Sequence, residues 1–344
     1  MFKKKLAVIG FGYWGKNIVR ILLSLPLTEV AICDPALANP PFPGDSRVYL
    51  YSFAEILQDR QIEMMFIATP ASTHYVLVKE ALLAGKHVFV EKPFTLSFSE
   101  AEELKTIARN TLLILMVGHI LQYHPAVLYL KEFIDSGGLG KILYFRSSRT
   151  SLGTVRPDTG VLWDMAVHDI DLACFLTGRL PLSVNAWNKA FLENSLGDMV
   201  TVQMTFPSGV IANLFASWLD PLKKRELVVV GDKKMAVFDD TSPSQKLAVI
   251  DRGVDYIKPY EYKDFGEYQL CYRYGDILYP FIDMQEPLRN EVIHFIDCVK
   301  NLSQPRTGDE KAVEAIKIME AADLSARNGG ETIFLDWNAQ EGRQ

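Results

Sequence analysis

The first third of this chain alternates short apolar runs with amphipathic stretches, and no other feature constrains its fold as strongly. Each apolar run is continuous, and the runs lie at residues 6–9, 30–32, 64–67, 87–90 and 112–117. Helical patterns lie between them, and one opens with the capping-box sequence Ser97-Phe98-Ser99-Glu100. Continuous apolar strands that alternate with helices are typical of a parallel sheet covered on both faces. The sequence therefore predicts a doubly wound α/β domain whose ligands bind at the carboxyl ends of the strands.

The pattern changes after about residue 123. Residues 199–206 alternate apolar and polar side chains, and the turn Pro207-Ser208-Gly209 leads into a second alternating run at residues 210–218. This arrangement predicts an antiparallel hairpin. Residues 225–230 and 233–238 predict another hairpin in the same way.

The remaining helical patterns and the chain length complete the predicted organisation. Helices are expected at residues 162–176, 286–300 and 309–328. A chain of 344 residues suggests two domains, since one domain usually takes about 100–200 residues. We place a doubly wound domain at residues 1–123 and an α+β domain, built on a largely antiparallel open sheet, at residues 124–344.

Charge, cysteine content and hydropathy exclude several classes of protein. The net charge is −6 and the Lys and Arg residues are spread along the chain, which argues against a nucleic-acid-binding protein. The four cysteines, at positions 33, 174, 271 and 298, form no C-x-x-C pair, as is typical of reduced thiols in the cytoplasm. No apolar run approaches the length of a membrane-spanning helix. We therefore expect a soluble cytoplasmic protein that binds neither nucleic acid nor a membrane.

A glycine motif directly follows the first apolar run. Gly10-Phe11-Gly12-Tyr13-Trp14-Gly15 has the spacing G-x-G-x-x-G and stands between a predicted strand and a predicted helix. Such glycines permit a tight turn, close approach of a pyrophosphate and close helix packing, and the helix N-terminus attracts phosphate. Asp34 ends the next predicted strand, where a carboxylate accepts hydrogen bonds from a ribose 2′-hydroxyl and repels a 2′-phosphate. The combination favours an NAD site over an ordinary turn between strand and helix.

Two further loops follow strands at the same edge of the predicted sheet. They are Ala68-Thr69-Pro70, with His74 near the start of the next helix, and Glu91-Lys92-Pro93. Both lie where a dinucleotide is expected to bind. Lys92 could orient a substrate hydroxyl and the cofactor or take part in proton transfer. A plain proline turn and a solvated lysine are the alternatives.

Asp164 and His168 lie four residues apart in a predicted helix of the second domain, so they share one face. An imidazole can take a proton from an alcohol as hydride leaves the carbon, and a nearby carboxylate can orient that imidazole. The alternative is a surface ion pair, and Asp169 and Asp171 could be solvated or capping groups. The sequence has no H-E-x-x-H or C-x-x-C spacing, so we expect no metal site.

Three arginines, Arg146, Arg149 and Arg156, precede this helix. Guanidinium forks match phosphate oxygens, so the segment could hold a substrate that carries a diphosphate. If residues 142–148 form a strand, however, Arg146 and Arg149 point to opposite faces, which weakens a clamp of three arginines. Solvated strand charges are the alternative.

These features together resemble the glucose–fructose oxidoreductase/inositol dehydrogenase family over nearly the whole chain. The resemblance rests on the glycine motif, on A-T-P-x-x-x-H at residues 68–74, on Glu91-Lys92-Pro93, on His124-Pro125 and on D-x-x-x-H-D-x-D at residues 164–171. It implies a Rossmann domain followed by an α+β domain whose open sheet commonly forms a dimer or tetramer interface. We therefore expect a homodimer or a homotetramer.

The resemblance also implies roles for individual residues. His168 matches the family's general base, and Lys92 and Asp164 match residues that assist proton transfer and orientation. The predicted cofactor contacts are Gly10, Phe11, Gly12, Tyr13, Trp14, Gly15, Asp34, Thr69, Pro70, His74, Glu91, Lys92 and Trp163. The predicted substrate contacts are Lys92, Tyr123, Arg149, Arg156, Asp164 and His168. Residues 119–123 and 158–163 depart from the frequent family pattern, so contacts to glucose or inositol do not carry over.

Further motifs, at residues 161–164, 217–221 and 230–235, are similar to family members that oxidise nucleotide sugars. The similarity implies NAD-dependent oxidation of a secondary sugar hydroxyl, at C3 of UDP-N-acetylglucosamine, which gives a 3-keto sugar for transamination in glycan biosynthesis. Oxidation of a UDP-uronic acid, a free sugar or an inositol-type polyol is the alternative. A non-catalytic regulator that senses NAD or sugar is an alternative of another class, and the proton-transfer residues argue against it.

Overall fold

The computed structural model describes residues 4–153, 155–156, 158–193, 196–256 and 270–337. Backbone contacts divide the chain into two units. Unit 1 comprises Met1–His124 and Gln285–Glu320, and unit 2 comprises Pro125–Met284 and Ala321–Gln344.

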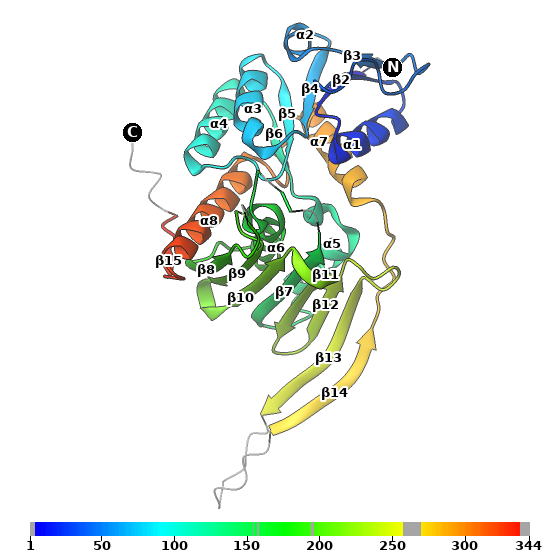
Figure 1. Ribbon diagram of the computed structural model, residues 1–344. Helices are drawn as coiled ribbons and strands as arrows, with labels where there is room; N and C mark the ends of the chain where they lie inside the picture. Colours follow the sequence, from blue (N-terminus) through cyan, green and yellow to red (C-terminus); the bar gives the residue numbers. More distant parts are fainter. Residues whose placement is uncertain (1–3, 154, 157, 194–195, 257–269, 338–344) are drawn as a thin grey trace, which may run out of the picture. The chain divides into compact units, whose positions relative to one another are not determined.

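The described residues of unit 1 form a parallel sheet with the strand order β3-β2-β1-β4-β5-β6 (Figure 1). The strands are β1 (Lys4–Ile9), β2 (Thr28–Cys33), β3 (Val48–Leu50), β4 (Ile62–Ile67), β5 (His87–Glu91) and β6 (Leu115–Gly118). The order reverses between β1 and β4, the kind of switch point at which doubly wound sheets bind their ligands. The predicted doubly wound fold is therefore confirmed.

Helices cover both faces of this sheet. They are α1 (Tyr13–Ser24), α2 (Phe53–Gln58), α3 (His74–Leu83), α4 (Phe98–Thr111), α7 (Pro287–Asn301) and the short helices η1 (Ala71–Thr73) and η2 (Ile120–Tyr123). In Figure 1, α1 and α7 lie on one face of the sheet and α3 and α4 on the other. The core contains a cluster of aromatic rings, because Phe66, Phe89 and Phe295 have centroids 5.2 to 6.0 Å apart.

Residues 285–320 pack in unit 1, whereas the sequence-based division at residue 123 assigns them to the second domain. The apolar face of α7 buries Val292 and Phe295 completely in the core of the parallel sheet. Farther along, Thr307 and Val117 exchange two hydrogen bonds, of 2.7 and 2.9 Å. The division differs because an amphipathic pattern shows that a helix buries one face, but not against which sheet.

Several element boundaries in unit 1 depend on single residues. The run predicted from residue 112 becomes a strand only at Leu115, because Leu112 has a φ of +55° and caps the end of α4. At the start of α4, Ser97 makes no capping bond with its side chain, and the N–H of Phe98 donates to the Glu320 carboxylate at 2.8 Å. Helix α2, which the sequence analysis did not predict, begins with a complete capping box between Ser52 and Glu55.

The described strands of unit 2 form a sheet in the order β14-β13-β12-β11-β7-β10-β9-β8-β15. All neighbours are antiparallel except β7 and β10, so the largely antiparallel sheet and both predicted hairpins are confirmed. The strands are β7 (Ile142–Leu152), β8 (Ser183–Lys189), β9 (Met199–Thr205), β10 (Ile211–Ser217), β11 (Leu219–Gly231), β12 (Met235–Asp239), β13 (Leu247–Tyr256), β14 (Leu270–Leu278) and β15 (Ile333–Phe334).

One face of this sheet is covered by helices and the other is open. The helices are α5 (Pro125–Asp135), the π-helix η3 (Leu162–Ala166), α6 (Val167–Thr177) and α8 (Asp309–Arg327), whose first part belongs to unit 1. The short η4 (Pro207–Gly209) forms the turn between β9 and β10. Helix η3 contacts β9 and β10, and α5 contacts β12. On the open face, Tyr144 and Trp187 are 42% and 50% exposed.

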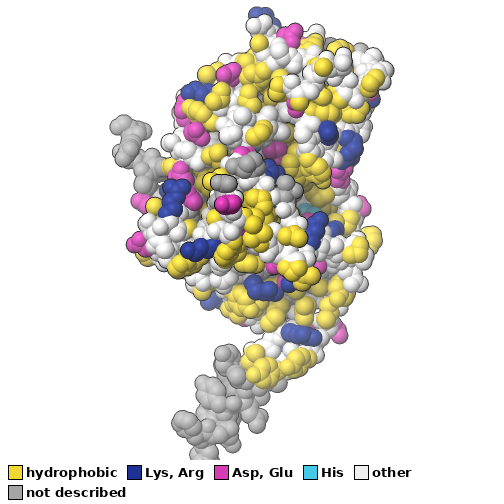
Figure 2. Space-filling model, in the orientation of Figure 1, with side chains coloured by type: hydrophobic (Ala, Val, Ile, Leu, Met, Phe, Trp, Pro, Cys, Tyr) yellow, Lys and Arg dark blue, Asp and Glu magenta, His cyan; other side chains and the backbone are white. Residues whose placement is uncertain are grey.

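Strands β13 and β14 extend past the other strands of unit 2 as a ribbon (Figure 1). Tyr272, Tyr274 and Ile277 of this ribbon are exposed, and Figure 2 shows hydrophobic side chains there. An exposed apolar surface of this kind is typical of an interaction site. The predicted homodimer or homotetramer stays a prediction.

Cys33, Cys174 and Cys298 are free thiols, and the side chain of Cys271 lies outside the described part of the structure. Within the described ranges, no helix is both long and apolar enough to span a membrane. The same ranges contain no group of three or more His, Cys, Asp or Glu side chains that could hold a metal ion.

Candidate functional site

The glycine motif forms the turn between β1 and α1, and two of its glycines are required by close contacts. Gly10 has a φ of +89°, and a Cβ there would lie 2.6 Å from the carbonyl oxygen of Ala68. A Cβ at Gly15 would overlap the carbonyl oxygen of Gly10. Gly12 differs, because a Cβ at this position would meet nothing within 4 Å. The turn is therefore closed on its protein side and open at Gly12.

The open side coincides with the N-terminus of α1. Gly12 is the N-cap residue, and no side chain caps the first turn of the helix. The free N–H groups of such a turn and the positive end of the helix dipole attract phosphate. These features fit the pyrophosphate of a dinucleotide.

Asp34 follows β2 and shapes the glycine turn from the neighbouring strand. Its carboxylate accepts hydrogen bonds from the N–H groups of Phe11, at 2.6 Å, and Ala36, at 2.8 Å. Each carboxylate oxygen can accept more than one hydrogen bond, so the half-buried group can also accept from a ribose hydroxyl. The residues of this edge thus fit NAD.

His74 connects the two other loops of the predicted cofactor edge. The residue is 1% exposed, and its ring nitrogens lie 2.8 Å from the carbonyl oxygen of Pro93 and 3.0 Å from that of Thr69. Thr73 closes the same turn, since its hydroxyl donates to Thr69 Oγ1 at 2.7 Å. The structure thereby brings Thr69-Pro70 and Glu91-Lys92-Pro93 together through a side chain that is itself buried.

Lys92 and Glu91 lie at the end of β5 in this assembly of loops. Glu91 is buried, Lys92 is half-buried, and the Lys92–Pro93 peptide bond is cis. Their predicted contacts with the cofactor and the substrate stay predictions.

Burial lowers the pKa of His74 despite its contacts with backbone carbonyls. A histidine whose folded-state pKa is lowered stabilises the protein above its unfolded pKa of about 6.5, and this stability is lost as the pH falls. We expect His74→Gln to make the unfolding free energy less dependent on pH between about 7 and 5, by up to about 1.4 kcal/mol per pH unit. Urea unfolding at both pH values measures this, and an unchanged slope would contradict the assignment.

In unit 2, Asp164 and His168 lie where the π-helix η3 passes into α6. The N–H of Val167 donates to the carbonyl oxygen of Leu162, five residues back, which produces the wider π turn. Such turns occur frequently at functional sites. The predicted helix over residues 162–176 is confirmed, but its first turn is π rather than α.

Arg156 forms an ion pair with Asp164 at the start of this helix. The distance from Arg156 Nε to Asp164 Oδ1 is 3.2 Å, and the two side chains are 46% and 16% exposed. The structure therefore brings together two of the predicted substrate contacts, with the guanidinium partly in solvent.

Arg149 lies on β7 and pairs with the carboxylate of Asp169 rather than with that of Asp164. Its Nε and Nη2 donate to the two oxygens of Asp169, at 2.8 and 3.0 Å, and both residues are buried. Burial acts to lower the pKa of Arg149, but the charge and hydrogen bonds of Asp169 outweigh it and hold this pKa above its usual value. Arg146 points to the opposite face, as predicted, and pairs with Glu226 at 3.0 Å.

This buried pair was missed by the sequence analysis, which treated Asp169 as a solvated or capping group. Asp169 and Asp171 are 2% and 6% exposed, so neither is a solvated group, one of the two possibilities that the sequence leaves open for them. Arg225, which lies near Arg149, is not indicated by the sequence pattern either. Burial lowers the pKa of Arg225, and the positive charge of Arg149 lowers it further. No local pattern signals these residues, because the partners come from different elements.

Two further predicted site residues have other surroundings. Tyr123 is 2% exposed, and its hydroxyl lies 3.1 Å from Thr307 Oγ1 within unit 1. Burial raises the pKa of this phenol. Trp163 is half-buried in η3. The predicted substrate contact of Tyr123 and cofactor contact of Trp163 stay predictions.

Comparison with known proteins adds independent information. Residues 4–119 match the family described as "Oxidoreductase family, NAD-binding Rossmann fold", and residues 127–237 match the "GFO/IDH/MocA C-terminal domain". The UDP-N-acetylglucosamine 3-dehydrogenase of Acidithiobacillus ferrooxidans is 38% identical over 220 residues, 63% of this chain and 68% of the relative. A solved structure of that organism's enzyme, GnnA, has a TM-score of 0.76 at 24% identity and covers 95% of this chain and 99% of its own.

The name of another relative indicates a different substrate. The scyllo-inositol 2-dehydrogenase (NAD(+)) of Bacillus subtilis is 28% identical over 286 residues, 80% of this chain and 78% of the relative. Both relatives are dehydrogenases by name, one of a nucleotide sugar and one of a polyol.

Proposed function

The chain belongs to the GFO/IDH/MocA family of NAD-binding oxidoreductases, and on this premise we propose that it oxidises the C3 hydroxyl of UDP-N-acetylglucosamine to a ketone. The main support for this substrate is the ion pair between Arg156 and Asp164. Asp164 stands four residues before His168 in the sequence. The pair supports the proposal because a partly exposed guanidinium, suited to a diphosphate, lies 3.2 Å from the Asp164 carboxylate. The 38% identity to a UDP-N-acetylglucosamine 3-dehydrogenase supports the same choice.

NAD is the cofactor, and when bound it supplies the acceptor for a hydride. The open turn at Gly12 and the N-terminus of α1 hold the pyrophosphate. Asp34 holds the adenosine ribose and at the same time fixes the glycine turn through the N–H of Phe11. This double contact makes the turn depend on a carboxylate at position 34.

His168 is the general base of the proposed reaction. As the C3–H bond breaks and its electron pair leaves as hydride, the C3–OH proton passes to the imidazole and the C=O bond forms. Asp164 orients the imidazole and stabilises its positive charge, and Lys92 assists by holding the substrate hydroxyl.

The arginines near this helix have separate roles in the proposal. Arg156 binds the diphosphate, whereas Arg149 acts through Asp169, the residue after His168, and is a positioning residue. A buried bidentate pair between β7 and α6 fixes the start of α6 and with it the backbone of His168. This assignment changes Arg149 from a substrate contact into a support for the base.

We expect two arginine variants to separate these roles. Arg149→Met leaves the Asp169 carboxylate buried without its partner and should lower the unfolding free energy by about 3–5 kcal/mol. Arg156→Met should change stability by less than about 1 kcal/mol but raise KM for the UDP-sugar roughly 10-fold or more. Urea unfolding and steady-state kinetics measure the two effects, with Arg146→Met on the opposite face as the unaffected control.

If Arg156→Met destabilises the protein as strongly as Arg149→Met while KM stays constant, the division of roles is wrong. Arg149→Lys adds a further test, because a lysine keeps the charge but cannot form the bidentate pair. Its unfolding free energy should lie between those of the wild type and Arg149→Met.

The proposed function is tested by a single turnover with enzyme and NAD in excess over UDP-N-acetylglucosamine. NADH fluorescence should rise, and excess enzyme prevents an unfavourable equilibrium from hiding the signal. Parallel reactions contain a UDP-uronic acid, free N-acetylglucosamine or scyllo-inositol. A rise with one of these substrates alone would reject the proposed one, and no rise with any of them would favour a non-catalytic sensor.

A further inference from the structure

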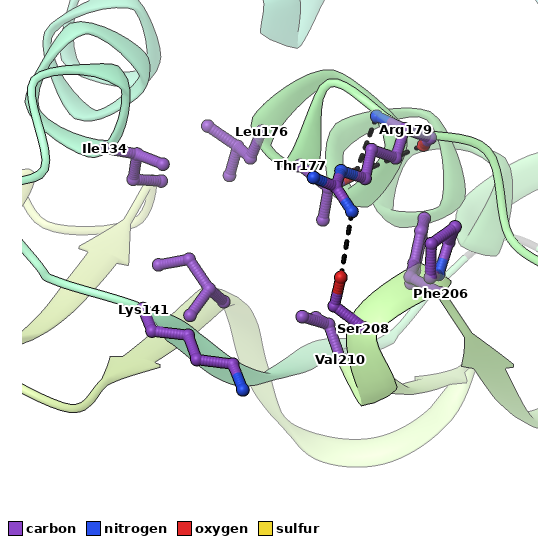
Figure 3. Close-up of a pocket in the computed structure, with 10 residues that line it drawn as sticks. Ile134, Lys141, Leu176, Thr177, Arg179, Phe206, Ser208 and Val210 are labelled. Atoms are coloured by element: carbon purple, nitrogen blue, oxygen red, sulfur yellow. Dashed lines mark hydrogen bonds between the residues drawn. The ribbon is translucent and has the colours of Figure 1, made fainter.

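A cavity with a volume of about 240 Å³ lies within unit 2. It is formed by the end of α5, the start of β7, the end of α6 and the turn between β9 and β10 (Figure 3). His168 and Thr177 stand at opposite ends of α6, and nine helical residues span about 14 Å. The cavity is therefore separate from the proposed acid–base residues.

The apolar part of this cavity is built from core side chains. Leu176 and Phe206 are each 1% exposed, and Ile134, Ile142 and Val210 are half-buried around them. Such an apolar surface can bind the hydrocarbon part of a small ligand, because binding buries that part away from water.

The polar part carries positive charge only. Lys141 and Arg179 line the cavity, and none of its lining residues is acidic. In Figure 3 the two cations lie on opposite sides of the space. Among the described residues, the side chains of Lys141 and Arg179 form no ion pair. The Asp232 carboxylate is nearby, but it accepts a hydrogen bond from the backbone N–H of Lys141. Two cations without a side-chain ion pair in the described part of the chain therefore line one small cavity, in a chain whose net charge is −6.

Ser208 holds one of these cations in place. Arg179 Nη1 donates to Ser208 Oγ at 3.0 Å, the hydrogen bond that Figure 3 draws between them. Ser208 has a φ of +69°, a left-handed conformation that favours glycine, and Gly209 beside it has a φ of +78°. A serine at such a position is strained, and residues held in strained conformations are frequent at ligand sites. Here the strained residue supplies the hydroxyl that orients the guanidinium.

We propose that this cavity binds a small phosphate monoester, with the phosphate between Lys141 and Arg179 and the organic body against Leu176 and Phe206. A phosphate monoester carries a charge of about −1.5 to −2 at neutral pH and so matches two cations better than a carboxylate does. The remaining N–H groups of Arg179 provide the planar fork that phosphate oxygens accept from. The negative end of α6 opposes an anion by only about half a charge.

The test is isothermal titration calorimetry of the protein with phenyl phosphate. The protein is saturated with NAD, so that the glycine turn between β1 and α1 is not available to the added phosphate. We expect saturable binding that is weakened roughly 10-fold or more in Lys141→Gln/Arg179→Gln, with Lys189→Gln as the exposed-lysine control. Inorganic phosphate and phenol should each bind more weakly than phenyl phosphate, since each lacks one half of the ligand. Equal affinity in the double variant, or no binding by the wild type, would overturn the proposal.

Ser208→Gly distinguishes a ligand site from a merely structural turn. Glycine adopts a positive φ without strain, so the melting temperature should be unchanged or higher, while affinity for phenyl phosphate should fall because Arg179 loses its partner. A variant that is less stable but binds normally would contradict the role given to Ser208. Inorganic phosphate binding as tightly as phenyl phosphate would show that the apolar surface contributes nothing and would overturn the ligand class.

Discussion

Replacement of His168 by alanine should lower the single-turnover rate of hydride transfer by about 10²–10⁴-fold, the contribution of a positioned general base. NAD affinity should be unchanged, because the proposed cofactor contacts, the glycine turn and Asp34, both lie in unit 1 and do not include His168. His168→Gln should lose activity to a similar extent, since an amide forms hydrogen bonds but does not take up the proton. Stopped-flow NADH fluorescence measures the rate, and fluorescence quenching by NAD measures binding.

A matched control comes from a histidine outside the proposed acid–base set. His87 Nδ1 accepts a hydrogen bond from the N–H of Ile114 at 2.9 Å, and in His87→Asn the amide oxygen, which is also bonded to Cγ, can take its place. This variant should keep the wild-type rate. Turnover by His168→Ala within about threefold of the wild type would remove His168 from the reaction, since a general base contributes far more.

The second large effect is expected at Gly12. Gly12→Ala should leave the fold intact, because the added Cβ meets no atom within 4 Å and the backbone φ of −73° suits any residue. NAD affinity should nevertheless fall roughly 10-fold or more, since the methyl group occupies the space through which a pyrophosphate approaches the backbone. Thermal unfolding without NAD and titration with NAD measure the two properties separately.

Gly15→Ala is the matched variant within the same motif. Its Cβ would overlap the carbonyl oxygen of Gly10, so the turn between β1 and α1 cannot keep its shape. This variant should lose both stability and NAD binding. If Gly12→Ala binds NAD as the wild type does, the pyrophosphate does not lie at this turn, and the account of the cofactor site fails.

Local features of the sequence predict most of the scaffold. Continuous apolar runs predict the parallel strands of unit 1, and strict alternation with a turn predicts the hairpin of β9 and β10. Helix α2 also has a local signal, because Ser52 and Glu55 have the S-x-x-E spacing of the capping box that they form in the structure. Within the glycine motif, Gly10 and Gly15 have a structural reason in the close contacts that a Cβ would make there, whereas Gly12 is left open for the proposed pyrophosphate.

Long-range pairing explains what the sequence does not predict. The pairing of Arg149 with Asp169 joins a strand to a helix, and nothing in either segment identifies the partner. Phe295 likewise packs on Phe66 although more than 200 residues separate them, so the return of residues 285–320 to unit 1 is invisible in a pattern of periodicity. Leu112 also departs from the prediction. It is the first residue of an apolar run, but it caps the end of α4 instead of belonging to a strand.

In the proposed reaction hydride leaves C3 of a UDP-linked N-acetylhexosamine, and an isotope label at C3 follows that hydride. The measurement is a single turnover with NAD and UDP-N-acetylglucosamine that carries deuterium at C3, followed by mass spectrometry of the nicotinamide. If hydride leaves C3, the deuterium appears in the reduced cofactor and C3 of the sugar becomes a ketone. Reduced cofactor without deuterium would place the oxidation at another carbon, and the absence of reduced cofactor with NAD bound would contradict the proposed substrate.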